Sequence, residues 1–250
     1  ALANVIAPYD PLLINYQATF TPPGGNYWVG TDDFGRDLLS RIIHGSRISI
    51  YVGVLAVILG PTTGALIGLI SGYAGGKTDL IVQRFMDILV SFPLLILAIA
   101  IVAALGPSTT NAVIAIALVL VPYGCRVIRS SVLSLKAMTY VDAARAMGCP
   151  PWRILFIHIL PNCLAPYVIL ASMQLGQAIL IEASLGFLGL GTPPPAPSWG
   201  SMLSGAGRQF VEVAPWMAIY PGIAITSAVF GANLLGDALR DVWDPKLRRA

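Results

Sequence analysis

Gly76, Lys77 and Thr78, in the stretch SGYAGGKTDL, nearly complete a phosphate-binding loop. Such a loop needs Gly-x-x-x-x-Gly-Lys-Ser/Thr, because its backbone N–H groups surround the phosphates while the lysine and the hydroxyl meet phosphate and magnesium. Ser71 stands where the first glycine is required. The stretch also follows a long apolar run, whereas a nucleotide loop follows a β-strand. We therefore interpret it as a tight turn from Gly72 to Gly76 and not as a nucleotide site.

Other residues that carry chemistry are few and scattered. The two histidines lie in separate segments without a nearby ligand set, and the three cysteines lack metal-ligand spacing. No Ser-His-Asp signature, Gly-x-Ser-x-Gly elbow or His-Glu-x-x-His helix is present. We expect that the chain is not an enzyme and binds no metal or cofactor of its own. The residues concerned are His44, His158, Cys125, Cys149 and Cys163.

The composition is that of a membrane protein. Hydrophobic residues make up 56% of the chain and charged residues only 11%, against roughly 25% charged in an average soluble domain. A bilayer-spanning helix needs about 20 mostly apolar residues, and continuous apolar runs favour helices over a barrel. We therefore predict an all-α integral membrane fold with five spans, at about 48–72, 85–106, 111–132, 158–181 and 214–236.

Each apolar run contains a proline. Proline removes a backbone donor and tends to kink a helix. Such bends either let a helical bundle open and close or are simply tolerated in a membrane, and the sequence leaves both readings open. The prolines are Pro61, Pro93, Pro122, Pro166 and Pro221.

Basic residues are distributed unequally over the segments between the runs. If the first run passes from outside to inside, eleven Lys and Arg residues fall on inner segments and four on outer ones. Short cytoplasmic loops carry such an excess, so we expect this orientation, with a cytoplasmic C-terminus. The inner residues are Lys77, Arg84, Arg126, Arg129, Lys136, Arg145, Arg153, Arg240, Lys246, Arg248 and Arg249, and the outer ones are Arg36, Arg41, Arg47 and Arg208.

Ionisable residues inside the runs are scarce, and Asp87 and Glu182 are the main cases. An ion-driven carrier needs groups near the midplane that bind the ion, so the sequence disfavours that class. Asp87 follows Arg84 at helical spacing, which favours a local ion pair over a proton relay. Glu182 either lies in a pathway or caps the turn that begins at Gly186.

The longest inner loop, KAMTYVDAARAMGCPPWRILFIHILPN, predicts a short helix with its own start and stop signals. Thr139 is placed to cap the helix, and Asp142 to reach back to its free N–H groups. Gly148 can take the left-handed conformation that ends a helix, and Pro150 and Pro151 prevent its resumption. Because so short a helix is marginal alone, we expect it to depend on contacts with another element. A solvated connecting helix is the alternative.

The same loop resembles the Glu-Ala-Ala motif of permease subunits of ATP-binding-cassette importers, which reads Glu-Ala-Ala, three residues, Gly, nine residues, Ile, one residue, Leu-Pro. Asp142-Ala143-Ala144 matches the triplet, Gly148 the glycine and Leu160-Pro161 the ending, while His158 takes the isoleucine position. In that family the loop helix docks into a groove of a cytoplasmic ATPase. The resemblance implies these coupling residues: Thr139, Tyr140, Asp142, Ala143, Ala144, Met147, Gly148, Leu160 and Pro161.

Three further segments are similar to the peptide/nickel permease family, in the subunit type of dipeptide and oligopeptide importers. They are WVGTDDFGRDLLSRIIHGSRISI, EASLGFLGLGTPPPAPSWGSML and NLLGDALRDVWDPKLRR. The resemblance runs from about Ala7 to Arg249 and implies the type I importer permease fold. Because members usually have six membrane helices, it also implies one helix missing before Ala1. The expected organisation is an outer segment, 1–45, and a permease domain, 46–250, with a coupling loop at 136–157 and an outer loop at 187–213.

Glycines and prolines give the outer loop a stiff, irregular path back toward the bundle. The resemblance implies that this loop helps to form an outer gate or the surface met by a solute-binding protein, through Gly191, Pro194, Pro195 and Trp199. A rigid connector between helices is the alternative.

The resemblance implies a multi-pass subunit of the bacterial plasma membrane that imports di- and oligopeptides by alternating access. The implied partners are a homologous second permease, two cytoplasmic ATPases that bind ATP and Mg, and an extracellular solute-binding protein, with no nucleic acid. The same machinery could serve nickel, glutathione or another small solute, because the motifs concern coupling and architecture. A passive channel or ion-driven carrier, which needs no ATPase, is the alternative from another class.

Overall fold

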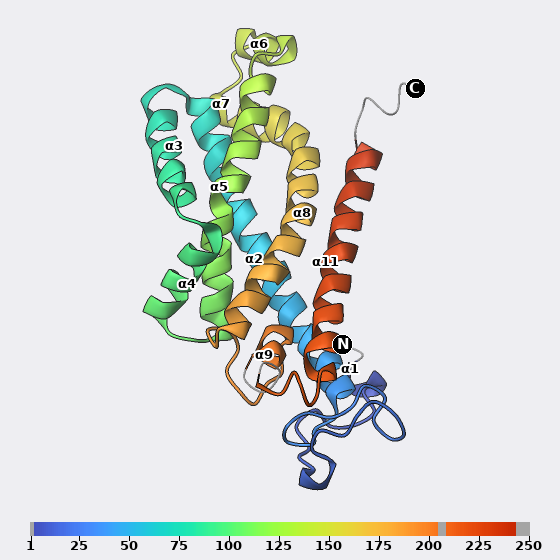
Figure 1. The fold of residues 1–250 in the computed structure, drawn as a ribbon. Helices are drawn as coiled ribbons and strands as arrows, with labels where there is room; N and C mark the ends of the chain where they lie inside the picture. Colours follow the sequence, from blue (N-terminus) through green and yellow to red (C-terminus); the bar gives the residue numbers. More distant parts are fainter. Residues whose placement is uncertain (1–2, 205–208, 244–250) are drawn as a thin grey trace. The chain divides into compact units, whose positions relative to one another are not determined.

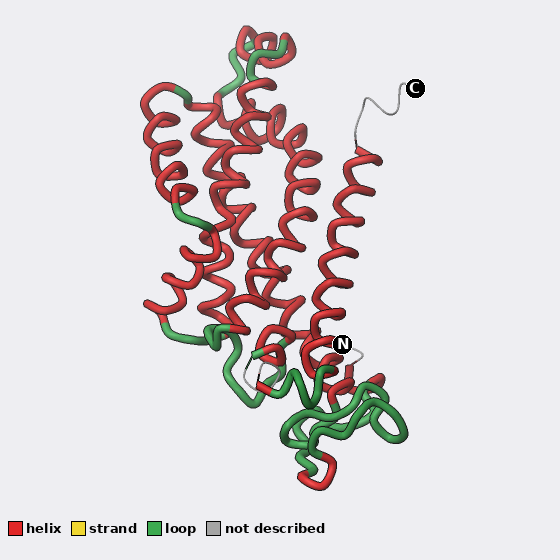
Figure 2. Tube along the Cα trace, viewed as in Figure 1, coloured by secondary structure: helices red, strands yellow, loops and turns green. Residues whose placement is uncertain are grey.

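Helices form the regular structure of the computed structural model, which describes residues 3–204 and 209–243 (Figures 1 and 2). Four of the basic residues counted for the orientation lie outside the described residues: Arg208, Lys246, Arg248 and Arg249. Ala1 lies outside them too. The helices are α1 (Ala3–Ile6), η1 (Tyr16–Ala18), α2 (Leu38–Ala74), α3 (Gly76–Ser91), α4 (Leu94–Leu105), α5 (Thr109–Leu135), α6 (Thr139–Ala146), α7 (Pro151–Arg153), η2 (Ile154–Ile159), α8 (Leu160–Phe187), α9 (Trp199–Leu203) and α11 (Trp216–Trp243).

Four of these stretches are long and apolar enough to cross a membrane: α2, α5, the continuous helix Pro151–Phe187, and α11. The number rises to five if the pair α3 and α4 counts as one span. These helices cover all five predicted runs and extend most of them by a turn or more. The prediction of an all-α membrane protein is confirmed.

The predicted span 85–106 is not a straight helix. It belongs to the pair α3 and α4, whose axes are bent by 91° at a short break. Phe92 in that break is extended, with ψ 138°, because the residue before a proline is sterically driven out of the helical region. Pro93 is therefore a true helix breaker, whereas the other four prolines lie inside continuous helices: Pro61, Pro122, Pro166 and Pro221.

The chain divides into two compact units, each made of separated segments. The first comprises residues 1–55, 95–116 and 176–231, and the second 56–94, 117–175 and 232–250. Helices α2, α5, α8 and α11 each contribute to both units. The first unit contains the outer loop, and the second contains the coupling loop.

In the second unit, α2 and α5 approach closely along a row of glycines. Gly60, Gly64 and Gly68 follow one another at four-residue spacing, so they share one face of α2. A Cβ atom on any of them would collide with the α5 backbone, at Ala117, Val121 and Cys125 respectively. Gly124 of α5 fits against Pro61 in the same way. Small residues of this kind let membrane helices pack backbone against backbone.

The stretch that resembles a phosphate-binding loop forms the sharp corner between α2 and α3. The corner is tighter than the predicted turn, because α2 continues through Gly72 to Ala74 and only Gly75 separates the helices. Gly75 and Gly76 both have positive φ, 67° and 55°, which glycine adopts without a steric cost. Lys77, the residue that would meet phosphate, is exposed on α3. The fold thus places this stretch after a helix and not after a strand.

An ion pair ties this corner to α5. Both carboxylate oxygens of Asp79 accept bonds from Arg129, each at 2.6 Å. Lys136 Nζ donates to the Gly72 carbonyl oxygen at 3.0 Å, at the C-terminal end of α2, where a cation is favourable. These contacts fix α3 to the helix pair.

A first prediction concerns the glycine row. Gly64→Ala should lower the thermal midpoint of the purified complex in nanodiscs by about 5 °C or more, because the added methyl group forces α2 and α5 apart. Gly231→Ala on α11 is the matched control, since a Cβ there meets nothing within 4 Å. Equal midpoints for the two variants would show that the close approach does not stabilise the fold.

Candidate functional site

Helix α6 of the coupling loop begins one residue earlier than its sequence signals predict. Met138 is the N-cap, with extended backbone, and Thr139 is the first helical residue. No side chain caps the helix, so the predicted cap by Thr139 is wrong. Asp142 does not reach back either, because Arg145 binds its carboxylate at 3.0 Å. Asp142 still lies in the first turn, where its charge opposes the helix dipole.

The end of α6 follows the prediction closely. Gly148 has φ +78°, its N–H donates to the Arg145 carbonyl at 2.9 Å, and the Cys149 N–H donates to the Ala144 carbonyl at 3.0 Å. This pair of bonds is the Schellman motif, which needs a left-handed residue after the helix. A Cβ on Gly148 would meet nothing within 4 Å. Backbone conformation, and not crowding inside the chain, therefore selects glycine here.

Helix α6 has one buried face and one exposed face. Val141 and Ala144 are buried in an apolar cluster with residues of α2, α5, η2 and α8: Leu69, Ile128, Val132, Ile154, Leu155, Ile159 and Cys163. Tyr140, Ala143 and Met147 are exposed, Met147 to 77%. Of the residues predicted for coupling, Ala144 thus faces the chain's own core. The exposed face remains available to a partner.

The end of the coupling loop enters α8 through a wide π-helical turn, η2. The Leu160 N–H donates to the Leu155 carbonyl, five residues back. Pro161 follows at once and supplies no N–H. The His158 carbonyl accepts from Asn162 Nδ2 at 2.8 Å and from the Tyr140 hydroxyl at 3.4 Å. His158 therefore joins α6 to this turn through its backbone, whatever side chain stands there.

The outer loop is anchored by Trp199, the first residue of α9. Its indole N–H donates to the Ile42 carbonyl at 3.0 Å, and its backbone N–H donates to the Ser49 hydroxyl at 3.2 Å. The side chain is buried. Gly200 also packs directly on the backbone of Ala183. Trp199 thus fastens the loop to α2 inside the first unit and offers no exposed surface to a partner.

Beside this anchor lies a cavity of about 470 Å³ within the first unit. Pro194 and Pro195 line it, together with Gly189 and Thr192 of the same loop. Gly191 does not line it but packs against Gly186. Charged residues just before and at the start of α2 also line it.

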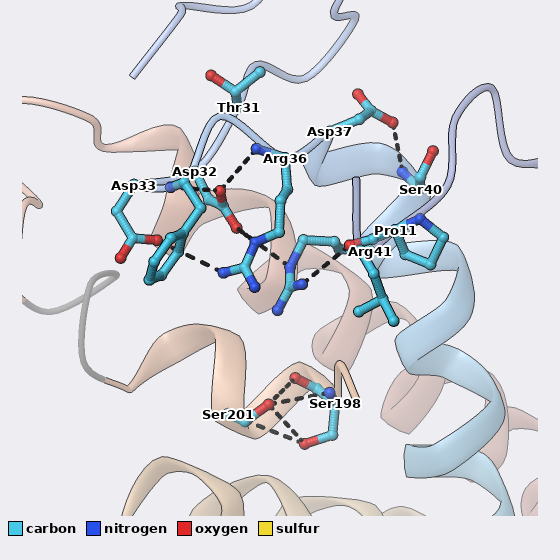
Figure 3. Close-up of polar contacts among 12 residues, drawn as sticks. Pro11, Thr31, Asp32, Asp33, Arg36, Asp37, Ser40, Arg41, Ser198 and Ser201 are labelled. Carbon is cyan, nitrogen blue, oxygen red and sulfur yellow. Dashed lines mark hydrogen bonds and ion pairs between the residues drawn. The ribbon is translucent and has the colours of Figure 1, made fainter. Parts of the chain in front are cut away.

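Those charged residues form one connected network around Asp32 (Figure 3). Its carboxylate accepts from the backbone N–H groups of Phe34 and Arg36, each at 2.9 Å, and from Arg36 Nε at 2.7 Å. Arg41 Nε lies 3.4 Å from the same carboxylate, and Arg41 Nη1 donates to the Pro11 carbonyl at 3.1 Å. The hydrogen-bonding capacity of the Asp32 carboxylate is thereby filled. The sequence shows the charges but not this arrangement, because it depends on the fold of the loop.

The two acidic residues singled out inside the runs have different surroundings. Asp87 lies 2.9 Å from Arg126 and 3.9 Å from Arg84, so an ion pair exists, but the closer partner comes from α5. Glu182 is buried, with the Ser49 and Ser198 hydroxyls beside it. Neither of its oxygens has a hydrogen-bond partner of good geometry among the described residues. Glu182 therefore does not cap the turn at Gly186.

Solved structures of transporter permeases share this fold. The chain matches an inward-facing structure of the MetNI methionine ABC transporter with a TM-score of 0.61 and 18% identity, covering 80% of this chain and 96% of that one. It also matches a crystal structure of an amino acid ABC transporter with histidines, with a TM-score of 0.60 and 19% identity, covering 84% of this chain and 94% of that one. At such low identity the likeness concerns the fold alone. The fold is that of an ABC importer permease.

The chain belongs to the family of binding-protein-dependent transport system inner membrane components, which matches residues 64–249. It is 47% identical to the dipeptide transport system permease protein DppC of Alkalihalophilus pseudofirmus, over 98% of this chain and 82% of that protein. The dipeptide transport system permease protein DppC of Haemophilus influenzae is also 47% identical, over 99% of this chain and 86% of that protein. The glutathione transport system permease protein GsiD of Pectobacterium atrosepticum is 44% identical, over 98% and 82%.

A second prediction concerns the stop signal of α6. Gly148→Val should speed trypsin cleavage after Arg145 about tenfold in the folded complex, because a β-branched residue cannot hold the left-handed conformation cheaply. Gly148→Asn should have a smaller effect, since asparagine tolerates that conformation. Gly106→Val, at another open position with φ +89°, should leave cleavage after Arg145 unchanged. Cleavage at the wild-type rate in Gly148→Val would contradict the assignment.

Proposed function

We propose that this chain is a permease subunit of an ATP-driven importer of short peptides in the bacterial plasma membrane. The observation that carries the proposal is the 47% identity to a dipeptide permease over 98% of the chain. Relatives at 44% identity are named for di/tripeptides and for glutathione, and glutathione is itself a short peptide. Peptides are therefore the favoured substrate class, and glutathione is the second candidate.

In the proposed cycle the energy comes from partner chains. A second, homologous permease completes the pathway, and two cytoplasmic ATPases bind ATP and Mg. A solute-binding protein delivers the peptide on the outer side. Closure of the ATPases on ATP drives the permease pair from inward-facing to outward-facing, and hydrolysis resets it. The C-terminus and the coupling loop lie in the cytoplasm in this scheme, as the excess of basic residues favours.

Helix α6 is the proposed contact with one ATPase. Its exposed face presents Tyr140, Ala143 and Met147, an apolar group suited to a groove. Its buried face rests on the core of the second unit, so a push on α6 is passed to α2, α5 and α8. Gly148 sets the direction in which the chain leaves this contact, and Leu160 and Pro161 carry the chain into α8.

The outer loop is the proposed outer gate. Pro194 and Pro195 restrict the backbone at the cavity, Gly191 allows close packing against α8, and Trp199 holds the loop on α2. Contact with the binding protein is then made by exposed neighbours of this loop.

A third prediction tests the energy source. In liposomes containing all four membrane-associated subunits and the binding protein, uptake of labelled Ala-Ala should require ATP and should stop with a hydrolysis-dead ATPase. A passive channel or an ion-driven carrier would still support flux there. Uptake that persists without hydrolysis would therefore overturn the proposed function.

A fourth prediction tests the docking face. Met147→Glu should reduce peptide uptake about tenfold or more, because it places a charge in an apolar contact that must lose its water. The fold should be unchanged, since this side chain is 77% exposed. Val242→Glu, at an apolar position near the end of α11 that is 55% exposed, is the control and should transport normally. Normal uptake by Met147→Glu would show that α6 does not dock through this face.

A further inference from the structure

We propose that the cavity beside the outer loop is a transit site that binds the charged termini of a peptide, with Asp33 receiving the ammonium group and Arg41 the carboxylate. The proposal rests on the proposed function, because it takes peptides as the substrate class. It assigns a binding role to residues of the first unit that lie outside the coupling loop.

The size and lining of the cavity suit such a ligand. Its volume of about 470 Å³ lies in the usual range for small-molecule sites, roughly 300–1,000 Å³. Its lining combines charged groups with uncharged, restricted backbone, at Thr192 and residues 193–195. A short peptide has one charge at each end, and the backbone between them carries variable side chains. A site that binds the ends accepts many sequences.

The charges of the cavity are balanced, but the ion pairs are of unequal quality. Asp32 is saturated by Arg36, Arg41 and backbone N–H groups. One guanidinium charge is left over, and its counterpart is Asp33. Asp33 lies 3.8 Å from Arg36 Nη2, which is too long for a hydrogen bond. The cavity thus contains two guanidinium groups that share Asp32 and a second carboxylate, Asp33, that is held only by a long ion pair. A zwitterion, with one positive and one negative end, complements this pattern.

Asp33 has the environment of a group that gains from an arriving cation. Its side chain is 24% exposed, so a ligand can reach it. Burial and the neighbouring Asp32 carboxylate raise the pKa of Asp33. The ionised form is therefore less stable than in water, and an ammonium group beside it would restore that stability.

Arg41 is held in place with donors to spare. Its side chain is only 9% exposed, and two contacts fix it, through Nε to Asp32 and through Nη1 to Pro11. Nη2 makes no hydrogen bond within the described residues. A guanidinium held in this way can bind a carboxylate with little loss of side-chain entropy.

The test uses the complete reconstituted importer and binding protein loaded with labelled Ala-Ala. Asp33→Asn should lower the maximal uptake rate about tenfold, since a charge-assisted bond is lost, while the concentration of binding protein at half-maximal rate stays the same. Asp33→Glu should keep most of the rate. Glu212→Gln, a carboxylate of the first unit that does not line the cavity, should match the wild type.

Two results would overturn the proposal. An unchanged maximal rate in Asp33→Asn would show that peptides pass without using Asp33. A change confined to the half-saturating concentration would show that the cavity binds the delivery protein and not the peptide. In either case normal wild-type uptake leaves the proposed function standing, whereas failure of ATP-dependent wild-type uptake refutes the function itself.

A measurement on the wild-type complex keeps the test valid even if Asp33→Asn does not assemble. Saturation-transfer NMR in nanodiscs, without binding protein, should give stronger signals for Ala-Ala than for N-acetyl-Ala-Ala or Ala-Ala amide. Asp33→Asn, where it assembles, should remove the preference for the free amine over the acetylated peptide. Equal signals for all three compounds on the wild type would refute recognition of the termini.

Discussion

The backbone contact between α2 and α5 is the constraint on which the second unit depends. A membrane interior supplies no water to drive apolar helices together, so van der Waals packing at small residues has to hold them. The glycine row of α2 permits this contact. Once the two helices lie so close, Arg129 reaches Asp79 and Lys136 reaches the end of α2. The same pair supplies the buried side chains on which α6 rests.

The first unit is held together by a different kind of interaction. Much of it is loop (Figure 2), and loops leave backbone groups that helices would otherwise satisfy. Side chains meet these groups: Asp32 accepts from backbone N–H groups, and the indoles of Trp199 and Trp216 donate to backbone carbonyls, Trp216 to Thr31 at 3.0 Å. Such bonds position a loop accurately. They also place charged groups around a cavity, which apolar helix packing cannot do.

Local signals in the sequence predicted local structure well, and long-range geometry poorly. Apolar runs correctly predicted the membrane helices, and Gly148 correctly predicted the end of α6. Both features depend on residues that are neighbours in the sequence. The cap by Thr139 failed because the helix starts one residue earlier, with Met138 as its extended N-cap and Thr139 already helical. The break at Pro93 and the Arg126 partner of Asp87 were missed. Proline has the same local chemistry in all five runs, and an ion pair between two helices requires their packing to be known.

The packing of α6 suits so short a helix to the coupling role proposed for it. Eight residues form a marginal helix in water, so an isolated α6 would unfold under load instead of transmitting it. Here Val141 and Ala144 fix one face to the core, and the Schellman motif with Gly148 fixes the exit. The Tyr140 hydroxyl adds a contact to η2, just before α8, by donating to the His158 carbonyl. The packing thus links the exposed face of α6 to α2, α5 and α8, and such a link is what ATP-driven transport in the proposed function requires.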